Sequence, residues 1–467
     1  MTSAANLLPP LNGNKILTGL LILACVGWAC SAPKSAVKPE SIPEKKTEKA
    51  DMGQKPVLKV DTVHWTEKKM DAPATIDQNN QVKVPPTNIR KKVQATSGKR
   101  SDSVYQILTL LPFKSTEVDT AATRLSPQML RYIHFYAGME MAVTDFGSKL
   151  NHPVEIKVRT AADSSDLNTI LKESERNLPH LILGPQKPDL IKMAAEWAQQ
   201  NDVNLISPWV SSSTLVEGNP NYIQVKPSLI AHYKYINDYV RRAYPVDHIT
   251  LVLRDDEAGK DQYFNDTSRY HQKMEVRILK ELDLATSNEP IITGLLRPEG
   301  TTVFVLPMGS TRDETFVYHF LRRVASEKEL KDVVVFGMSK WLEMKSDVID
   351  LLHSQQVRMS ASNFADPDLY EIRSFKKRYF DRYREFPSED VLEGYDLMHY
   401  CLHSLCAHGP EFHRSLYDEK NVHYLQTQYE ILPVYRNASE ASGQPDYYEN
   451  GYIRLVELKN NKLREIE

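Results

Sequence analysis

The chain has 467 residues, with 58 basic and 61 acidic side chains, and is 41% hydrophobic and 25% charged. This length allows two or three globular domains, and the average composition excludes collagen, a coiled coil or a polytopic membrane protein. A formal net charge of −3 gives no basis for binding nucleic acid. Four cysteines are too few for a disulfide framework in a chain of this size.

The N-terminal region is typical of an export signal. Residues 15–30 contain one lysine, then an apolar stretch, and end in Ala-Cys. This stretch is short for a bilayer span, and an Ala directly before a Cys resembles the lipobox of bacterial lipoproteins, in which the cysteine thiol carries the lipid. We expect residues 1–30 to be a lipoprotein signal peptide with Cys30 lipidated, and Cys25 is the alternative. A plain secretory signal or a transmembrane anchor remains open.

Residues 31–103 are rich in Lys, Glu, Pro and Thr and carry fifteen basic and nine acidic side chains. Such a segment buries too little apolar area to offset the entropy of ordering. We therefore predict a disordered tether, whose end-to-end distance as a coil would be roughly 50 Å.

From Val104 onward, short apolar runs alternate with longer amphipathic ones, which predicts parallel sheets covered by helices. In a first unit the expected strands are 104–111, 154–160, 180–184 and 203–206, and the expected helices are 130–150, 165–177 and 189–201. The pattern restarts with strands at 248–253, 301–306 and 332–336 and with helices at 261–274, 313–326 and 346–354. The prediction is an α/β protein with two doubly wound, Rossmann-like lobes.

The C-terminal part adds two expected helices, 369–386 and 389–408, and a strand at 429–435. A hairpin is expected at 452–466, because Asn460 and Asn461 separate two alternating segments and suit a turn that needs positive φ.

Motifs for catalysis are missing from the sequence, which has no Gly-x-Ser-x-Gly, Walker or His-Glu-x-x-His pattern. His399 and His403 would share one face of a helix and could suit a metal, but no third ligand stands at a fitting offset. We interpret them as helix packing, and Cys401 and Cys406 as core residues that point apart. We expect a protein without enzymatic activity, metal or cofactor.

Ligands of open parallel sheets bind beyond the carboxyl ends of the strands. The serine run 211–213 beside Trp209 is the strongest candidate, because hydroxyls offer adaptable hydrogen bonds next to a stacking surface. Capping of the following helix is the alternative role for these serines. The expected ligand-binding residues at these strand ends are Lys114, Gln186, Trp209, Ser211 and Ser212 in the first unit and Asp255, Ser310 and Ser339 in the second.

Several motifs, in this order, resemble the type I periplasmic binding proteins of the branched-chain amino-acid class. The likeness runs from about Val104 to Leu405 and rests on residues 138–143, Leu183-Gly-Pro185, Leu205-Ile-Ser-Pro208, residues 255–261, Val335-Phe-Gly-Met338, residues 375–383 and Gly394-Tyr395-Asp396. The resemblance implies two α/β lobes joined by three crossover strands, with a ligand captured in the cleft by hinge closure. The same fold also occurs in lipoprotein activators of penicillin-binding proteins.

With this resemblance we divide the folded part into lobe 1 at 104–228, lobe 2 at 229–360, a return to lobe 1 at 361–425, and C-terminal strands at 426–467 that close lobe 2. The sequence departs from the amino-acid binders at the ligand positions. Gln186 stands where a Ser or Thr would help hold the α-carboxylate, although Val210 and Ser211 keep the second part of that contact. Ser339-Lys340 replaces the acidic residue that would pair the α-ammonium, and Ala258 replaces a Tyr.

Two functional interpretations follow. The first is a lipid-anchored solute-binding protein that faces the periplasm, captures a small polar ligand and presents it to the permease of an ABC transporter. The second is a lipoprotein regulator or scaffold of cell-envelope enzymes. The long cationic tether and the missing ammonium partner favour the second, because an ion removed from water without a partner costs several kcal/mol.

Overall fold

The computed structural model describes residues 62–64, 103–113, 125–212, 214–414, 422, 424–435 and 444–466. They belong to one compact unit of the chain, Lys59–Glu467. The predicted signal peptide and lipidation sites lie outside the described residues, as does most of the predicted tether. Thr62–His64 of that tether form strand β1, which pairs antiparallel with β3, so the prediction of disorder is wrong for these three residues.

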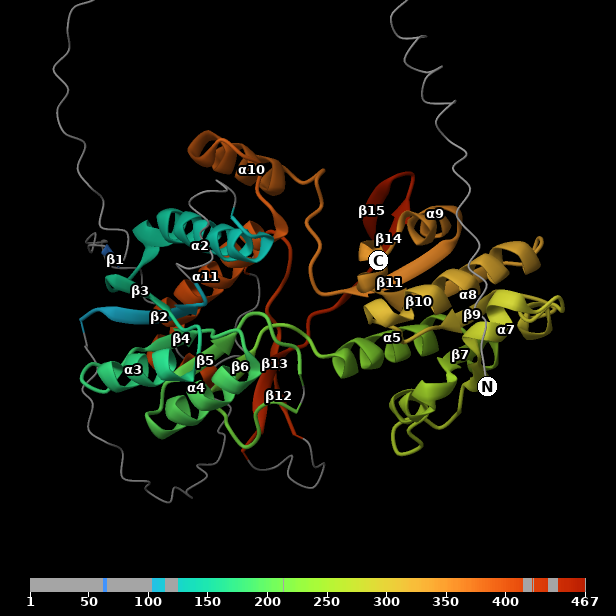
Figure 1. Cartoon of the computed structure of the whole chain (residues 1–467), viewed down its shortest axis with the longest axis horizontal. Helices are drawn as coiled ribbons and strands as arrows, with labels where there is room; N and C mark the ends of the chain where they lie inside the picture. The colour runs from blue at the N-terminus through green and yellow to red at the C-terminus, as the bar shows by residue number, and fades with distance from the viewer. Residues whose placement is uncertain are drawn as a thin grey trace, which may run out of the picture. The chain divides into compact units, whose positions relative to one another are not determined.

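Lobe 1 is built on an eight-stranded, largely parallel sheet in the order β1-β3-β2-β4-β5-β6-β13-β12 (Figure 1). Its strands after β1 are β2 (Tyr105–Leu111), β3 (Val154–Thr160), β4 (Leu181–Leu183), β5 (Asn204–Ser207), β6 (Tyr222–Gln224), β12 (Ile431–Val434) and β13 (Tyr447–Asn450).

Helices cover both faces of this sheet. One apolar cluster joins the sheet to α2 (Pro127–Phe146), α10 (Tyr370–Tyr383) and α11 (Glu389–His408). A separate cluster joins it to α3 (Ser164–Ser174) and α4 (Pro188–Gln200). The doubly wound arrangement predicted for the first unit is therefore confirmed.

Glycines set the close approach of α2 and α11. A Cβ added to Gly138 would lie 2.0 Å from the carbonyl oxygen of Val391, and one added to Gly394 would lie 2.0 Å from that of Phe135. Only hydrogen fits at either crossing point. Two of the motifs quoted above thus contain residues needed for helix packing.

Lobe 2 is built on a seven-stranded sheet in the order β15-β14-β11-β10-β9-β7-β8. Its strands are β7 (Ile249–Arg254), β8 (Glu275–Leu279), β9 (Thr302–Val305), β10 (Val333–Met338), β11 (Gln356–Ala361), β14 (Arg454–Lys459) and β15 (Lys462–Ile466). Its helices are α5 (Leu229–Ala243), α6 (Asp261–Phe264), α7 (Glu281–Thr286), α8 (Glu314–Glu327) and α9 (Ser346–Ser354), with short 3₁₀ segments between them. A single apolar cluster runs through this lobe.

The chain passes between the two sheets three times, after β6, after β11 and after β13. The expected position of residues 426–467 is therefore wrong in part, because only β14 and β15 join the sheet of lobe 2. β13 instead pairs parallel with β6 in lobe 1, and β12 pairs with β13. The Glu449 carboxylate of β13 also accepts a hydrogen bond from the Ser228 backbone N–H, which ties β13 to the segment that follows β6.

The helix expected at 261–274 is also wrong beyond Phe264. Asn265 ends it, because its side chain donates to the Met274 carbonyl oxygen at 3.2 Å and accepts from the Met274 N–H at 2.8 Å. These two bonds close a loop where the sequence pattern indicated continuing helix. By contrast, Asn460 and Asn461 adopt φ of 53° and 57°, as expected for the hairpin turn between β14 and β15.

Candidate ligand-binding cleft

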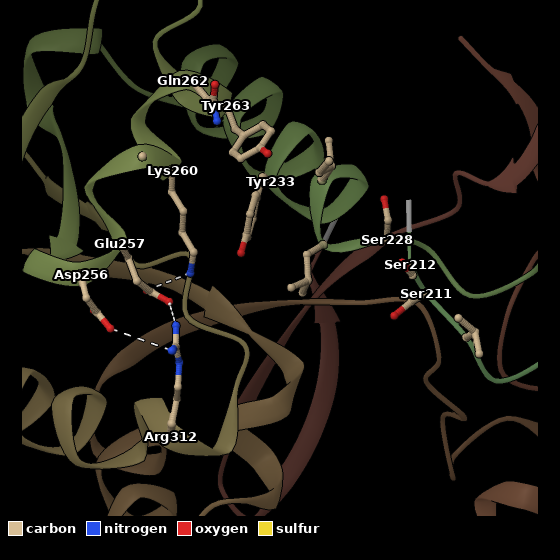
Figure 2. A pocket seen from close by; sticks show the side chains of 14 residues that line it. Ser211, Ser212, Ser228, Tyr233, Asp256, Glu257, Lys260, Gln262, Tyr263 and Arg312 are labelled. Carbon is tan, nitrogen blue, oxygen red and sulfur yellow. Dashed lines mark hydrogen bonds and ion pairs between the residues drawn. The ribbon is translucent and has the colours of Figure 1, made fainter. Parts of the chain in front are cut away.

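A cavity of about 770 Å³ is lined by residues of both lobes. We call it the cleft cavity. Figure 2 shows serines on one wall and charged and aromatic side chains on the other. The lining residues are Val210, Ser211, Ser212, Ser228, Leu229, Ile230, Tyr233, Asp256, Glu257, Gly259, Lys260, Gln262, Tyr263 and Arg312.

The lobe 1 wall is the loop that follows β5. Ser211 is exposed, and the Ser212 hydroxyl oxygen accepts a long hydrogen bond of 3.4 Å from the Thr214 N–H. Trp209 turns away from the cavity and packs at 5.0 Å between ring centroids against Phe135 of α2. The loop is thus held from behind by an aromatic contact, while its hydroxyls remain available to a ligand.

Ser228 begins the second part of the wall, where the chain enters lobe 2. Its hydroxyl accepts from the Ala231 N–H at 3.2 Å and so caps α5. A capping serine fixes the first turn of a helix, because it satisfies an N–H that has no partner within the helix. The cap therefore sets where Leu229, Ile230 and Tyr233 meet the cavity.

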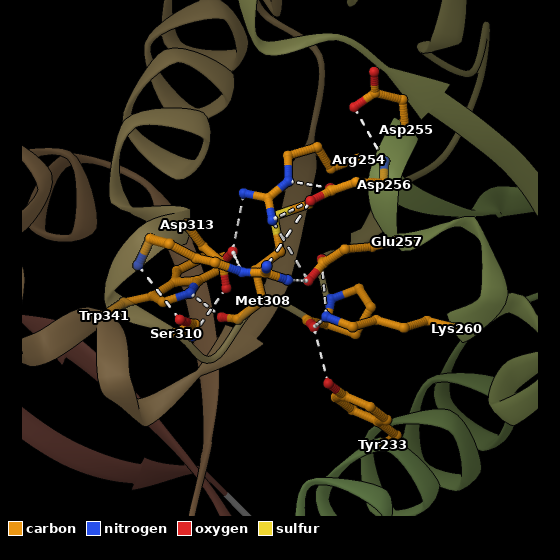
Figure 3. A network of polar contacts seen from close by, with 12 residues as sticks. Tyr233, Arg254, Asp255, Asp256, Glu257, Lys260, Met308, Ser310, Asp313 and Trp341 are labelled. Atoms are coloured by element: carbon orange, nitrogen blue, oxygen red, sulfur yellow. Dashed lines mark hydrogen bonds and ion pairs between the residues drawn. The ribbon is translucent and has the colours of Figure 1, made fainter.

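The lobe 2 wall is an ion cluster built by the loops after β7 and β9 (Figure 3). We call it the lobe 2 ion cluster; its members are Arg254, Asp256, Glu257, Lys260, Arg312 and Asp313. Three cations thus face three carboxylates, and the cluster is neutral as a whole.

Glu257 is the centre of this cluster, with a side chain that is only 5% exposed. Its carboxylate lies 2.8 Å from the Lys260 Nζ and 2.7 Å from an Arg312 guanidinium nitrogen. Asp313 is buried behind it, 3.1 Å from an Arg254 guanidinium nitrogen, and also accepts the Ser310 N–H at 2.9 Å. Burying a carboxylate is tolerated only when it is paired and hydrogen-bonded, and both groups meet that condition.

Lys260 and Tyr233 are fixed by a shared acceptor. The Lys260 Nζ donates to the Pro307 carbonyl oxygen at 2.8 Å, and the Tyr233 hydroxyl donates to the same oxygen at 3.1 Å. Burial, followed by the nearby Glu257 and Asp313 carboxylates, raises the pKa of Tyr233. The phenol therefore stays protonated and acts as a hydrogen-bond donor at neutral pH.

Two of the eight residues expected to bind ligand, Ser211 and Ser212, line the cleft cavity. Lys114 lies outside the described residues. Gln186 accepts the Tyr132 hydroxyl in lobe 1, and Ser310 caps the 3₁₀ turn that precedes α8. Trp209, Asp255 and Ser339 are likewise not among the residues that line the cavity.

The charged residues of the cavity were not predicted from the sequence; they are Asp256, Glu257, Lys260 and Arg312. The first three lie in the acidic and basic run after β7, one to five residues beyond Asp255, and this run was the available signal. Arg312 lies two residues beyond Ser310. Both loops were thus predicted correctly as parts of the site. Which residue of each loop reaches the cavity depends on how the two loops pack against each other.

The side chains that line the cavity are suited to binding a ligand through hydrogen bonds and charge. Among the described residues, no group of three or more His, Cys, Asp or Glu side chains is placed to hold a metal ion. The hydroxyls, phenols and the Gln262 amide provide hydrogen bonds. Arg312 is the most accessible charge, with a side chain that is 61% exposed.

The architecture matches solved structures of binding proteins. A branched-chain amino-acid ABC transporter protein from Rhodospirillum rubrum superposes with a TM-score of 0.56 at 12% sequence identity, over 78% of this chain and 100% of that one. The chain has the fold of type I periplasmic binding proteins. A substrate-binding protein from Desulfitobacterium hafniense, solved with leucine, gives a TM-score of 0.50 at 14% identity, with coverage of 78% and 100%.

The LpoA C-domain from Haemophilus influenzae, described as a regulator of PBP1A, superposes with a TM-score of 0.49 at 10% identity, over 78% of this chain and 100% of that one. Neither a family model nor a curated protein sequence matches this chain. In the part of the chain that the structure describes, no helix is both long and apolar enough to cross a bilayer.

Proposed function

We propose that this protein is a non-catalytic, extracytoplasmic solute-binding protein. It captures a small polar ligand, amino-acid-like or peptide-like, in the cleft cavity and presents the closed form to the permease of an ABC transporter. The observation that supports this most directly is the lining of the cavity. Residues of both lobes contribute to one space of about 770 Å³, a size suited to a small molecule.

Capture requires that the ligand bind both walls. The serine loop of lobe 1 offers hydroxyls, and Arg312 of lobe 2 offers guanidinium N–H groups at an accessible position. Both kinds of donor suit a carboxylate. A ligand that bridges them favours the closed arrangement by its differential affinity for that state.

The alternative is a regulator or scaffold of cell-envelope enzymes that act on peptidoglycan. One observation favours it. The two carboxylates that line the cleft cavity, Asp256 and Glu257, are both paired with cations of the lobe 2 ion cluster. An incoming ammonium would have to displace Arg254, Lys260 or Arg312 from them, and this would weaken the binding of a free amino acid.

A thermal-shift screen of amino acids, short peptides and cell-wall fragments tests the proposal. A ligand that binds only the folded state stabilises it by RT ln(1 + c/Kd), where c is the free ligand concentration, so Tm should rise with the logarithm of that concentration once it exceeds Kd. Ser211→Leu should abolish the shift, because the larger side chain enters the cavity. Ser339→Leu is the matched control and should keep the shift, because Ser339 does not line the cavity. If no compound changes Tm, the solute-binding proposal fails and the scaffold is favoured.

We also propose that the protein is held at a membrane of the bacterial envelope by lipid on Cys30, with Cys25 as the alternative. Several acyl chains, at about 0.8 kcal/mol per buried methylene, would supply essentially all of the membrane affinity. Cys30→Ser should therefore release the protein into the soluble fraction. If both Cys30→Ser and Cys25→Ser remain in the membrane fraction, the anchor is wrong.

A further inference from the structure

A second cavity, of about 890 Å³, lies beside the segments that connect the lobes. We call it the hinge cavity. One wall is a face of α5, and the other is the β12–β13 pair at the edge of the lobe 1 sheet. The lining residues are Thr214, Ser228, Ile230, Ala231, Lys234, Tyr235, Asp238, Arg242, Leu432, Pro433, Val434, Tyr435, Tyr447, Glu449 and Gly451.

Some charged side chains that line this cavity have ion-pair or hydrogen-bond partners among the described residues, and others do not. Lys234 and Arg242 stand eight positions apart on the same face of α5, and neither side chain makes an ion pair or hydrogen bond with the rest of the described chain. Asp238 between them is engaged elsewhere, since it accepts the Tyr270 hydroxyl at 2.6 Å and lies 3.7 Å from Arg269. Among the described residues, these two exposed cations of the α5 wall therefore have no ion-pair or hydrogen-bond partner.

The carboxylate at the base of the cavity is already satisfied. Glu449 is only 7% exposed, and its two oxygens accept from the Ser228 N–H and from the Tyr447 hydroxyl. It leaves no oxygen facing the cavity without a partner. The remaining lining is largely apolar, and it includes Leu432, which is 45% exposed on an edge strand.

We propose that the hinge cavity is a second binding site, which takes a small amphipathic anion with a carboxylate head and an apolar body. The carboxylate would contact Lys234 or Arg242 on either side of Asp238, whose charge is balanced by Arg269 at 3.7 Å, and the apolar body would cover Ile230, Leu432 and the tyrosines of the opposite wall. Coulomb attraction to two cations and burial of apolar surface act together for this ligand class. A cationic ligand of the same shape would be repelled at the α5 wall.

The site is coupled to the cleft cavity through shared residues. Ser228 and Ile230 line both cavities, and they lie on the segment by which the chain enters α5. A ligand in the hinge cavity therefore contacts both lobes at a crossing that must move when the cleft closes. By linkage, an occupant of one cavity changes the affinity of the other by the same factor in both directions.

Titration calorimetry of the full chain with decanoate tests the site, and needs no ligand in the cleft cavity. We expect saturable binding of one decanoate per chain, and no comparable binding of decylamine. Replacing both cations, Lys234→Gln with Arg242→Gln, should weaken decanoate binding by about twofold to thirtyfold, since two exposed charge contacts are lost. Arg176→Gln with Lys192→Gln, two exposed cations of lobe 1 outside the cavity, is the matched control and should bind as the unmodified chain does.

Absence of saturable decanoate binding would overturn the proposal. So would equal binding of decylamine, or an affinity unchanged by the double substitution at Lys234 and Arg242. Each of these outcomes is distinguished from the cleft screen by the substituted residues, because Lys234 and Arg242 line the hinge cavity and not the cleft cavity. A negative cleft screen together with decanoate binding here would therefore leave this second site in place.

Discussion

The carboxylates beside the cleft in lobe 2 and two buried carboxylates of lobe 1 are stabilised in different ways. In lobe 2, Glu257 and Asp313 face the cations Arg254, Lys260 and Arg312 in one neutral cluster. In lobe 1, Asp396 is fully buried and accepts the backbone N–H groups of Leu425 and Gln426 at 2.7 and 2.9 Å. Within the described residues Asp396 makes no ion pair. Glu449 is likewise held by uncharged donors, the Ser228 N–H and the Tyr447 hydroxyl.

The two kinds of carboxylate contact have different structural roles. The ion pairs of lobe 2 fix the wall of the cleft cavity, whereas the carboxylates of lobe 1 hold the segments that connect the lobes. Gln426, held by Asp396, also accepts the Phe364 N–H at 2.7 Å from the second crossing, and Ser228, held by Glu449, lies in the first. A ligand therefore meets a preformed charged wall, and the crossings are held both by uncharged donors to Asp396 and Glu449 and by the ion pair of Lys226 with Glu393 at 3.7 Å.

The largest effect is expected at Asp313. Asp313→Ala removes one buried partner of Arg254, which keeps Asp256 and Glu257, and it removes the acceptor of the Ser310 N–H. Breaking a buried pair on one side costs up to about 3 to 5 kcal/mol. Urea denaturation measures this loss in the free energy of unfolding. Asp255→Ala, an exposed neighbour, should change stability by about 0.5 kcal/mol or less. Equal effects of the two substitutions would show that the cluster does not stabilise lobe 2.

The next effect depends on pH. Burial raises the pKa of Asp396 from 3.8 to about 7, so the folded state binds its proton more tightly than the unfolded state. Its contribution to stability is complete below pH 4 and is lost as pH rises to 7, by up to about 4 kcal/mol at 1.36 kcal/mol per pH unit.

Asp396→Asn removes this titration. The free energy of unfolding of the unmodified chain, measured relative to the Asn variant, should therefore fall between pH 4 and pH 7 and level off above it. Denaturation series at four pH values provide the comparison. A difference between the two proteins that is constant with pH would mean that Asp396 titrates alike in the folded and unfolded states.

A smaller effect is expected at Glu449. Glu449→Gln keeps the shape but leaves one oxygen acceptor where two N–H and O–H donors converge, so one donor loses its partner at a cost of about 1 to 2 kcal/mol. The exposed Glu430→Gln is its control and should have almost no effect on the urea midpoint. A Gln variant as stable as the unmodified chain would show that neither donor depends on the carboxylate.

Regular elements with a strong periodic pattern could be predicted from the sequence. Helices 346–354 and 389–408 and strand 154–160 have the bounds expected for them. β8 was missed because it is the edge strand of its sheet and carries Glu275 and Arg277 within a half-exposed pattern. β13 was missed because its partner, β6, is more than two hundred residues away in sequence, and pairing at that separation leaves no local signal.

The loops that form the cleft could be predicted from the sequence, but the side chains that line the cavity could not. Ligands bind beyond the carboxyl ends of the strands in open parallel sheets, and this predicted the loops after β5, β7 and β9 as the site. Ser211 and Ser212, both in the loop after β5, line the cavity. Which charged residue of a loop reaches the cavity depends on the meeting of distant loops. Arg312 approaches Glu257 across fifty-five positions, and nothing in either segment alone specifies that pair.

Small-angle X-ray scattering tests the central claim most directly, namely that a ligand bridges the two walls of the cleft cavity. The radius of gyration of the full chain is measured with and without the compound that raises Tm most, alongside Ser211→Leu. We predict that the compound decreases the radius of gyration of the unmodified chain and leaves that of Ser211→Leu unchanged. A compound that raises Tm fully while the radius of gyration stays constant, or that compacts Ser211→Leu equally, would contradict capture by closure of this cleft.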